Sequence, residues 1–292
     1  MILFPQGEKD YSSVMTHTSP LISTEDLATR LGDPTLKVID GSWHLDGRDP
    51  AAGHLAARIP GAVRFDLEAV SDHTTDLPHM LPTPGAFAAA VGALGVSEGD
   101  TVVIYDTAGL FSAPRVWWTF RLMGATDVRV LDGGLPCWLA EGRAVESGPT
   151  ATPTPALFTP TPRPGDVADL PTILAALTGE AQIVDARPAA RFSGETAEPR
   201  PGLRSGHMPG ALNLPFKGLL TEDGRMRRGD DLSARFAEVG LDIDGPIITS
   251  CGSGVTAAIL TLALAELGRD SALYDGSWAE WGGRADTPVE AG

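Results

Sequence analysis

The chain has little cysteine: its 292 residues include only Cys137 and Cys251. Two thiols are too few for a disulfide framework or for a tetrahedral thiolate metal site, and they fit a reducing compartment. No apolar run approaches the ~20 residues of a membrane helix, and the N-terminal segment lacks the basic stretch followed by an apolar one that marks a secretory signal. We therefore expect a cytoplasmic protein with no membrane segment and no metal.

Positive charge is also scarce. The sequence has 22 Lys and Arg against 38 Asp and Glu, a formal net charge of −16, which disfavours binding to nucleic acid or to an anionic membrane. Hydrophobic residues make up 42% and charged residues 21% of the chain, as in ordinary globular proteins, so wholesale disorder is excluded. At roughly 150 residues per domain, the length predicts two domains.

The segment 148–165 contains six prolines and five threonines in eighteen residues, which predicts a linker without helix or strand. We accordingly expect one domain over 21–147 and a second over 166–292. Residues 1–20 are expected to form a disordered extension, in which Met15 offers an alternative start.

The two halves of the chain repeat one order of signals. Each half offers five short apolar strand candidates separated by helical patterns, which predicts an α/β domain with a mainly parallel sheet. Four pairs of residues recur at offsets of 143 to 149 positions: Asp40 and Asp185, Pro60 and Pro209, Asp132 and Asp275, Trp138 and Trp281. Sheets of this kind carry their sites at the carboxyl ends of the strands.

The most informative segment is 246–268, PIITSCGSGVTAAILTLALAELG, whose pattern predicts an apolar strand, a tight polar loop and a helix. Cys251 stands at the turn from strand to helix. The two glycines of the loop allow its backbone N–H groups to converge, and the helix presents its positive end to the same point. Such surroundings stabilise a thiolate, which is the reactive form of cysteine.

Two interpretations of Cys251 stand at this point, because a free cysteine after an apolar strand is often a small core hydrophobe. The Gly-Ser-Gly loop favours a nucleophile, since a packed thiol needs no such cradle. Ser253 and Thr256 would add hydroxyl groups to it. Cys137 lies in an amphipathic helical pattern without such a loop, and we expect it to be a packing residue.

Six segments together resemble those of a known family: CGSGVTA (251–257), YDGSWAEW (274–281), GHMPGALNLPF (206–216), SAPRVWW (112–118), LDGG (131–134) and HMLP (79–82). With them the chain resembles the tandem-rhodanese sulfurtransferases, and among these the 3-mercaptopyruvate sulfurtransferases, from about Ile22 to Pro288. The resemblance implies an α/β fold of two tandem rhodanese-like domains, each with a mainly parallel five-stranded sheet flanked by helices. It implies no metal or organic cofactor, only a covalent cysteine persulfide.

In that family a cysteine of the C-terminal domain takes sulfur from a small-molecule donor. It passes the sulfur to cyanide or to a thiol acceptor such as thioredoxin or a low-molecular-weight thiol. Cys251 matches this cysteine and Ser253 its hydroxyl partner, and the substrate-binding loop is completed by Gly252, Gly254, Val255 and Thr256. The N-terminal domain is expected to be catalytically silent, because Asp106 stands where the second half has Cys251.

The loop also bears on the choice of donor. Members that use the dianion thiosulfate resemble CRKGVT here, whereas this chain has the uncharged Gly252 and Ser253, which suit the monoanionic mercaptopyruvate better. Family members bind the donor carboxylate with two arginines nine residues apart, and Arg191 and Arg200 in ARFSGETAEPR match both. Without the resemblance, the two arginines would be interpreted as solvated surface charges.

The sequence departs from the family at the proposed catalytic histidine. Where members have HIPGA this chain has ARIPGA, so Arg58 occupies the histidine position, and the proposed aspartate matches Asp49. Arginine cannot act as a general base near neutral pH because its pKa exceeds about 12, although it can bind an anion or stabilise a thiolate. His54 is a possible substitute if its segment is helical and faces the cleft.

Three functions remain open. The first is transfer of sulfur from 3-mercaptopyruvate to a thiol or cyanide, with release of pyruvate. The second is thiosulfate:cyanide sulfurtransferase, which the missing loop cations disfavour, and the third is a persulfide carrier or regulatory module with little turnover, which Arg58 keeps open. A phosphatase or arsenate reductase on a related fold would need an arginine at the end of the loop, where Ala257 stands.

Overall fold

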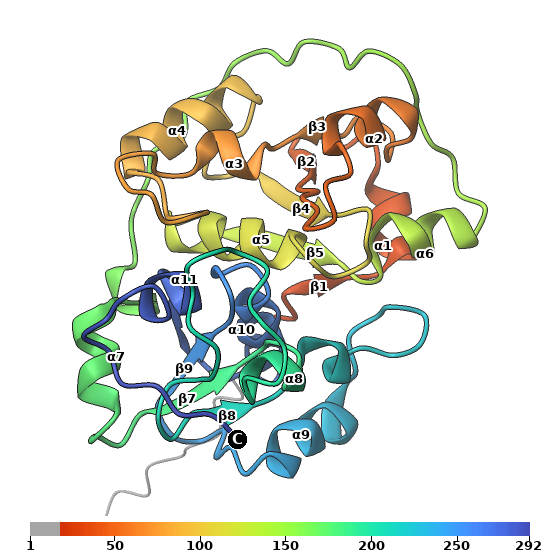
Figure 1. Cartoon of the computed structure of the whole chain (residues 1–292). Helices are drawn as coiled ribbons and strands as arrows, with labels where there is room; N and C mark the ends of the chain where they lie inside the picture. Colours follow the sequence, from red (N-terminus) through yellow and green to blue (C-terminus); the bar gives the residue numbers. More distant parts are fainter. Residues whose placement is uncertain (1–17) are drawn as a thin grey trace, which may run out of the picture.

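The computed structural model describes residues 18–292, which form two α/β domains (Figure 1). The strands of the N-terminal domain are β1 (Leu21–Ile22), β2 (Leu36–Asp40), β3 (Val63–Arg64), β4 (Thr101–Tyr105) and β5 (Asp127–Leu131). Those of the C-terminal domain are β6 (Val167–Ala168), β7 (Gln182–Asp185), β8 (Leu212–Asn213), β9 (Ile247–Ser250) and β10 (Ala272–Tyr274). All the strand pairs within the two sheets are parallel.

The two sheets share one topology. Their strand orders are β1-β5-β4-β2-β3 and β6-β10-β9-β7-β8, so each strand of the second sheet takes the place of its counterpart in the first. The predicted fold of two α/β domains with five-stranded parallel sheets is confirmed, and the repeat in the sequence is also a repeat in the structure.

Helices flank both sheets. The N-terminal domain contains α1 (Thr24–Arg30), α2 (Pro50–Ala56), α3 (Leu67–Val70), α4 (Pro84–Ala93), α5 (Ala113–Leu122) and α6 (Gly134–Ala140). The C-terminal domain contains α7 (Leu170–Ala176), α8 (Ala189–Phe192), α9 (Gly229–Glu238), α10 (Ala257–Glu266) and α11 (Ser277–Trp281), and two 3₁₀ turns at Pro164–Asp166 and Phe216–Leu219.

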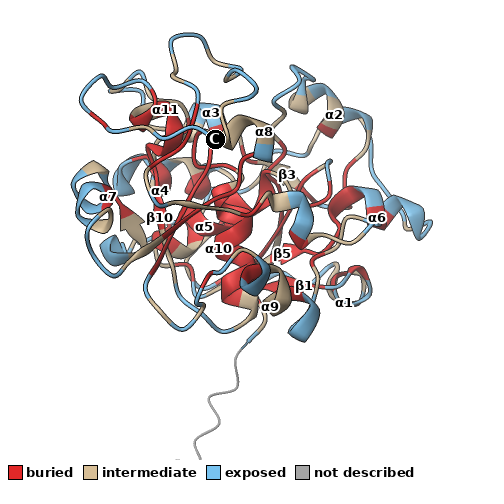
Figure 2. Ribbon diagram, turned by 60° about the horizontal axis from the view of Figure 1, so that its bottom comes forward, coloured by how far each residue is buried: buried red, intermediate tan, exposed pale blue. Residues whose placement is uncertain are grey.

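Helices α5 and α10 pack against each other and join the two domains (Figure 1). Every residue of α10 except Glu266 is buried, and so is every residue of α5 except Arg121, as the red ribbons in Figure 2 show. A helix that is apolar all round has to be covered on all sides. Helix α10 meets this need because its own sheet covers one side and α5 covers the other. The hydrophobic core therefore runs through the domain interface.

The chain between 147 and 163 forms neither helix nor strand and crosses the N-terminal domain to reach α7 (Figure 1). It is held to that domain by backbone hydrogen bonds, from Ala156 N–H to the Gly92 carbonyl (2.9 Å) and from Thr161 N–H to the Met123 carbonyl (2.8 Å). Phe158 is buried among the aromatic rings of Phe87 and Phe120. The proline-rich segment is therefore an ordered linker that packs on the N-terminal domain.

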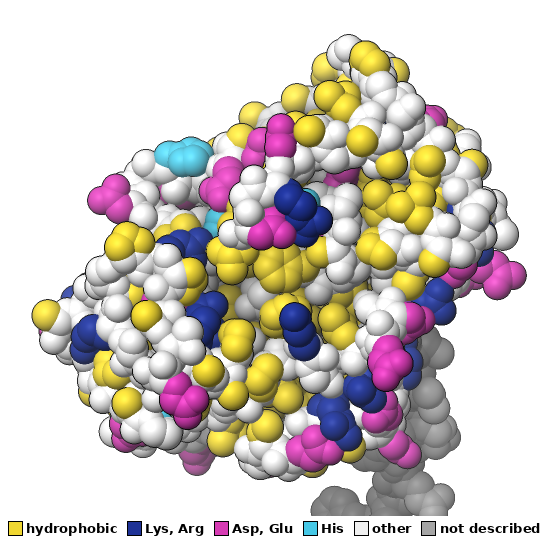
Figure 3. Space-filling model, turned by 45° about the vertical axis from the view of Figure 1, so that its right-hand side comes forward, with side chains coloured by type: hydrophobic (Ala, Val, Ile, Leu, Met, Phe, Trp, Pro, Cys, Tyr) yellow, Lys and Arg dark blue, Asp and Glu magenta, His cyan; other side chains and the backbone are white. Residues whose placement is uncertain are grey.

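Of the residues 1–20 expected to be disordered, residues 1–17 lie outside the described part of the chain. The carbonyl of Pro20 accepts the N–H of Val130 at 2.8 Å and leads into β1. On the face drawn in Figure 3, Asp and Glu side chains are interspersed with Lys and Arg around a hydrophobic surface.

Candidate functional site

Cys251 lies directly after β9, at the carboxyl edge of the C-terminal sheet, and α10 begins at Ala257. Its side chain is 1% exposed and lines a cavity of about 120 Å³. The C-terminal domain lines this cavity with Arg187, Pro188, Arg191, Pro199, Arg200, Phe216, Cys251, Gly252, Ser253, Val255 and Thr256, and the N-terminal domain with Trp43, Leu45 and Phe111. The cavity is thus a site between the two domains.

Helix α11 fixes the direction of the loop's peptide groups. Trp278 N–H donates to the Cys251 carbonyl and Ala279 N–H donates to the Gly252 carbonyl, both at 2.9 Å. In a trans peptide unit the N–H points opposite to the C=O. The N–H groups of Gly252 and Ser253 therefore point away from α11, and within residues 18–292 neither donates to a protein acceptor. They are available to a sulfur anion on Cys251.

The N-terminal domain shows how such a loop binds an anion. Asp106 follows β4 as Cys251 follows β9, and its carboxylate accepts four backbone N–H groups at 2.8–2.9 Å, from Ala108, Phe111, Ser112 and Ala113. The turn after the central strand is therefore an anion cradle that the first repeat fills with its own carboxylate. In the second repeat, a cysteine takes the corresponding place.

One wall of the cavity is a cluster of charges centred on Glu198. Arg187 is 1% exposed and pairs with Asp185 at 2.7 Å and with Glu198 at 2.8 Å. Burial alone would lower the pKa of Arg187, but its two carboxylate partners raise it above the ordinary value. Arg191 also binds Glu198, through Nε at 3.2 Å and through Nη2. Glu198 thereby holds the Arg191 guanidinium in one orientation.

Arg191 lies against the loop at Gly252. A Cβ atom placed on this glycine would be only 3.0 Å from Arg191 Nη2. A larger residue at position 252 would force the guanidinium to shift. The glycine thus leaves the space that Arg191 occupies next to Cys251.

Arg200 is the cation of the cavity without an acidic partner: among residues 18–292, no carboxylate lies within 4.0 Å of its guanidinium. Burial lowers the pKa of Arg200 and outweighs the opposing effects of Cys251 and Glu68. A partly desolvated guanidinium with free N–H donors binds a carboxylate strongly. The site therefore contains one uncompensated positive charge.

His79 holds Arg200 from the N-terminal domain, with 3.3 Å between His79 Nε2 and Arg200 Nη2. Burial, together with the charges of Arg115 and Arg200, lowers the pKa of His79 to about 3, so the imidazole is neutral. Because a guanidinium only donates, Nε2 accepts and the proton lies on Nδ1. Glu68 Oε1 is 3.4 Å from Nδ1, but the two atoms form no hydrogen bond. His79 belongs to the HMLP segment, but that pattern alone does not predict this contact with Arg200.

A buried ion pair across the domain interface packs against the cysteine loop at Gly254. Arg115 on α5 donates to Asp275 Oδ1 at 2.6 Å, and Leu81 N–H donates to Asp275 Oδ2 at 2.8 Å. Gly254 has φ +76°, and a Cβ atom there would come within 2.7 Å of Arg115 Nη1. Only a glycine fits between this backbone and the guanidinium. Gly254 thus lies behind the cavity, whereas Gly252, Ser253, Val255 and Thr256 line it.

Asp49 and Arg58 do not line the cavity. Asp49 is an exposed N-cap of α2 and accepts the N–H groups of Ala51 and Ala52. Arg58 is 4% exposed, and its guanidinium donates to the Gly148 carbonyl at 2.7 Å and lies 3.5 Å from Glu146. Asp49 thus caps the helix and the Arg58 guanidinium binds the linker backbone, and we propose no catalytic role for either residue.

His54 does not replace the missing histidine either. It is buried between Asp40, 2.8 Å from its Nδ1, and Thr150, 3.0 Å from its Nε2. Cys137 is buried in the domain interface, and its thiol donates to the Asp223 carbonyl at 3.2 Å. Burial raises the pKa of the Cys137 thiol, which makes it a poor nucleophile and fits the packing role expected of it.

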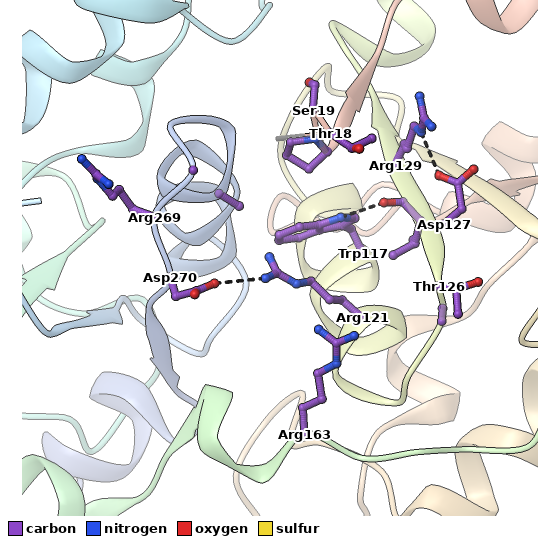
Figure 4. A pocket seen from close by; sticks show the side chains of 15 residues that line it. Thr18, Ser19, Trp117, Arg121, Thr126, Asp127, Arg129, Arg163, Arg269 and Asp270 are labelled. Carbon is purple, nitrogen blue, oxygen red and sulfur yellow. Dashed lines mark hydrogen bonds and ion pairs between the residues drawn. The ribbon is translucent and has the colours of Figure 1, made fainter. Parts of the chain in front are cut away.

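A second cavity, of about 350 Å³, is lined by residues at the amino ends of β5 and β10 (Figure 4). Cys251 follows the carboxyl end of β9 and so lies at the opposite edge of the parallel sheet. Four arginines line it: Arg121, Arg129, Arg163 and Arg269. Three of them pair with aspartates at 2.6–3.3 Å, namely Asp270, Asp127 and Asp244. Helices α5 and α10 end here, and the arginines balance the negative ends of their dipoles. Because this cavity is lined by no cysteine, we assign the chemistry to the first one.

The fold agrees with what the comparisons with known proteins show. The model of the rhodanese-like domain family matches the chain twice, over residues 23–141 and 170–284. The chain therefore belongs to the rhodanese-like family and carries two such domains in tandem.

Among its relatives, the chain is 47% identical over 280 residues to the 3-mercaptopyruvate sulfurtransferase of Escherichia coli (strain K12), a match covering 94% of this chain and 98% of that protein. It is 42% identical over 275 residues to the thiosulfate sulfurtransferase of Bos taurus, covering 91% and 92% of the two chains. Among solved structures it is similar to the 3-mercaptopyruvate sulfotransferase SseA from Escherichia coli, with a TM-score of 0.82 and 44% identity over 89% of this chain and 99% of that one.

Two further observations concern the described residues alone. Within 18–292, each helix is too short or too polar to cross a membrane. In the same range, no three side chains of His, Cys, Asp and Glu gather as metal ligands.

Proposed function

We propose that this protein is a 3-mercaptopyruvate sulfurtransferase in which Cys251 carries the transferred sulfur. The observation that supports this most directly is the pairing of Cys251 with Arg200 in one small cavity. The cysteine sits in an N–H cradle, and the guanidinium has no acidic partner among the described residues. A small donor with one carboxylate and one sulfur atom fits this arrangement.

The donor binds with its carboxylate on Arg200 and on the part of Arg191 that Glu198 leaves free. Arg200 offers planar, forked donors that match a carboxylate, and Arg191 adds the N–H groups that do not bind Glu198. Glu198 and His79 hold the two arginines in place, so little conformational freedom is lost when the donor binds.

The first half-reaction forms a persulfide. The Cys251 thiolate attacks the sulfur atom of 3-mercaptopyruvate, a sulfur–sulfur bond forms, and the carbon–sulfur bond breaks. The electron pair of the broken bond goes to the carbon, so pyruvate leaves as its enolate and takes a proton from water. The backbone N–H groups of Gly252 and Ser253, with the Ser253 hydroxyl, stabilise the sulfur anions.

In the second half-reaction a nucleophile attacks the outer sulfur of the persulfide and releases the Cys251 thiolate. We propose a thiol acceptor, such as thioredoxin or a low-molecular-weight thiol, and cyanide serves in the assay.

The chemistry needs no metal or organic cofactor, because the cysteine itself carries the sulfur. A cytoplasmic location follows from the scarcity of cysteine.

The experiment measures kcat/KM for sulfur transfer to cyanide from 3-mercaptopyruvate and from thiosulfate, side by side, with Cys251→Ser as the blank. We expect mercaptopyruvate to be preferred by tenfold or more, about 1.4 kcal/mol in transition-state terms. Equal or reversed preference would make thiosulfate the donor, as in the name of the Bos taurus relative. No turnover of either donor would favour the persulfide carrier instead.

A further inference from the structure

Within residues 18–292, two residues other than glycine have a positive φ, His79 (61°) and Ser277 (47°), and both lie beside the site. A left-handed backbone is unfavourable for a residue with a Cβ atom, and it persists where the surroundings hold it. His79 contacts Arg200, as described above. Ser277 is the first residue of α11 and is completely buried.

The Ser277 hydroxyl joins the cysteine loop to the end of β10. It donates to the Tyr274 carbonyl at 2.8 Å. It accepts the N–H of Cys251 at 3.3 Å and the N–H of Gly254 at 3.1 Å. A hydroxyl has one donor and two acceptor lone pairs, so all three are occupied. The two loop N–H groups that point toward α11 are therefore both bound by one oxygen.

The first repeat has the same turn without the hydroxyl. Leu135 N–H donates to the Asp106 carbonyl at 3.0 Å, as Trp278 N–H donates to the Cys251 carbonyl. Gly134, the counterpart of Ser277, has φ +55°, and a Cβ atom there would come within 2.5 Å of the Asp106 carbonyl oxygen.

The comparison of the two turns separates the backbone from the side chain. Glycine would adopt the conformation of Ser277 without strain, as it does in the first repeat. The backbone therefore does not account for a serine at position 277. The contacts of the Ser277 hydroxyl with the cysteine loop account for the serine.

We infer that Ser277 is a positioning residue of the sulfur-transfer site, which acts through the loop and touches no substrate. By binding the N–H groups of Cys251 and Gly254, its hydroxyl fixes the curl of the loop. The N–H groups of Gly252 and Ser253 are then left facing the sulfur anion. The inference rests on the proposed function for its effect on turnover, but its effect on the thiolate of Cys251 can be measured separately.

The test uses Ser277→Gly and Ser277→Ala in the full chain, with Ser250→Ala as a matched control. Ser250 directly precedes Cys251 and is equally buried, but its hydroxyl has no hydrogen-bond partner in the described part of the chain. Three quantities are measured: kcat/KM for 3-mercaptopyruvate, the pH midpoint of Cys251 alkylation by iodoacetamide, followed on its peptide by mass spectrometry, and the melting temperature.

We expect both Ser277 variants to lose at least tenfold in kcat/KM and to shift the pH midpoint of alkylation upward by about one unit, the equivalent of a tenfold change. Ser250→Ala should match the wild type in both. Ser277→Gly should melt at or above Ser277→Ala, because glycine relieves the left-handed backbone. If Ser277→Ala does not fold, the values for Ser277→Gly alone test the inference.

An alkylation midpoint and a kcat/KM for Ser277→Gly that both equal the wild-type values would overturn the inference while leaving the proposed function intact. A loss of melting temperature without a shift of the midpoint would also overturn it, since the role would then be structural. If the wild type does not turn over 3-mercaptopyruvate, the proposed function fails, and the alkylation midpoints still decide the role of Ser277.

Discussion

Arg200→Met removes the one cavity cation that lacks an acidic partner among the described residues, while keeping a side chain of similar reach. A hydrogen bond to a charged group contributes about 1.5–3 kcal/mol. A guanidinium fork on the donor carboxylate falls at the upper part of this range, because Arg200 is partly withdrawn from water. We therefore expect kcat/KM for 3-mercaptopyruvate to fall about 100-fold, which corresponds to about 2.7 kcal/mol.

The same change should leave the free energy of unfolding unchanged or raise it, because a partly desolvated charge without an acidic partner is costly. Arg191→Met is the matched comparison: there Glu198 loses one of its two arginines, so the free energy of unfolding should fall by about 1–3 kcal/mol. Activity is measured with cyanide as the acceptor and stability by urea denaturation. An Arg200→Met protein whose kcat/KM stays within threefold of the wild type would refute the carboxylate site.

Three further outcomes follow. The pKa of His79 is about 3 in the folded protein against about 6.5 in the unfolded chain, so the free energy of unfolding should fall by about 1.4 kcal/mol per pH unit as the pH drops from 6.5 to 3. His79→Gln should flatten that slope in acid unfolding curves. Because the amide oxygen can still accept from Arg200, kcat/KM should stay within about threefold of the wild type. Removing either partner of the buried Arg115–Asp275 pair should cost about 3–5 kcal/mol in urea unfolding, with strong non-additivity in the double variant; additive losses would contradict the pairing. Asp49→Ala should lose about 0.5–2 kcal/mol of stability, because α2 loses its N-cap, while kcat/KM stays within twofold of the wild type. A larger loss of kcat/KM would show that Asp49 has a catalytic role.

Much of the fold follows from the sequence, because its signals are local. Strands such as β4 and β9 are short apolar runs followed by polar turns, and their recurrence at a nearly fixed offset predicts two similar domains. The loop at Cys251 is equally local, since its glycines, its cysteine and the following helix are contiguous.

What the sequence does not predict is which distant residues meet at the loop. Arg58 and Asp49 match family positions, but the Arg58 guanidinium binds the linker backbone and Asp49 caps a helix. His79 and Ser277 approach the site through left-handed backbone conformations and long-range contacts, which no spacing in the sequence reveals. Local patterns predict the position of Cys251, whereas the residues that we propose to orient its loop come from tertiary packing.

The central claim, that Cys251 carries the transferred sulfur, is tested most directly by mass spectrometry of the protein after incubation with 3-mercaptopyruvate and no acceptor. The account predicts that the intact protein gains the mass of one sulfur atom, that the addition maps to the Cys251 peptide, and that cyanide removes it. Cys251→Ser should gain nothing. Sulfur found on Cys137, or no sulfur on Cys251 while pyruvate is released, would contradict the account.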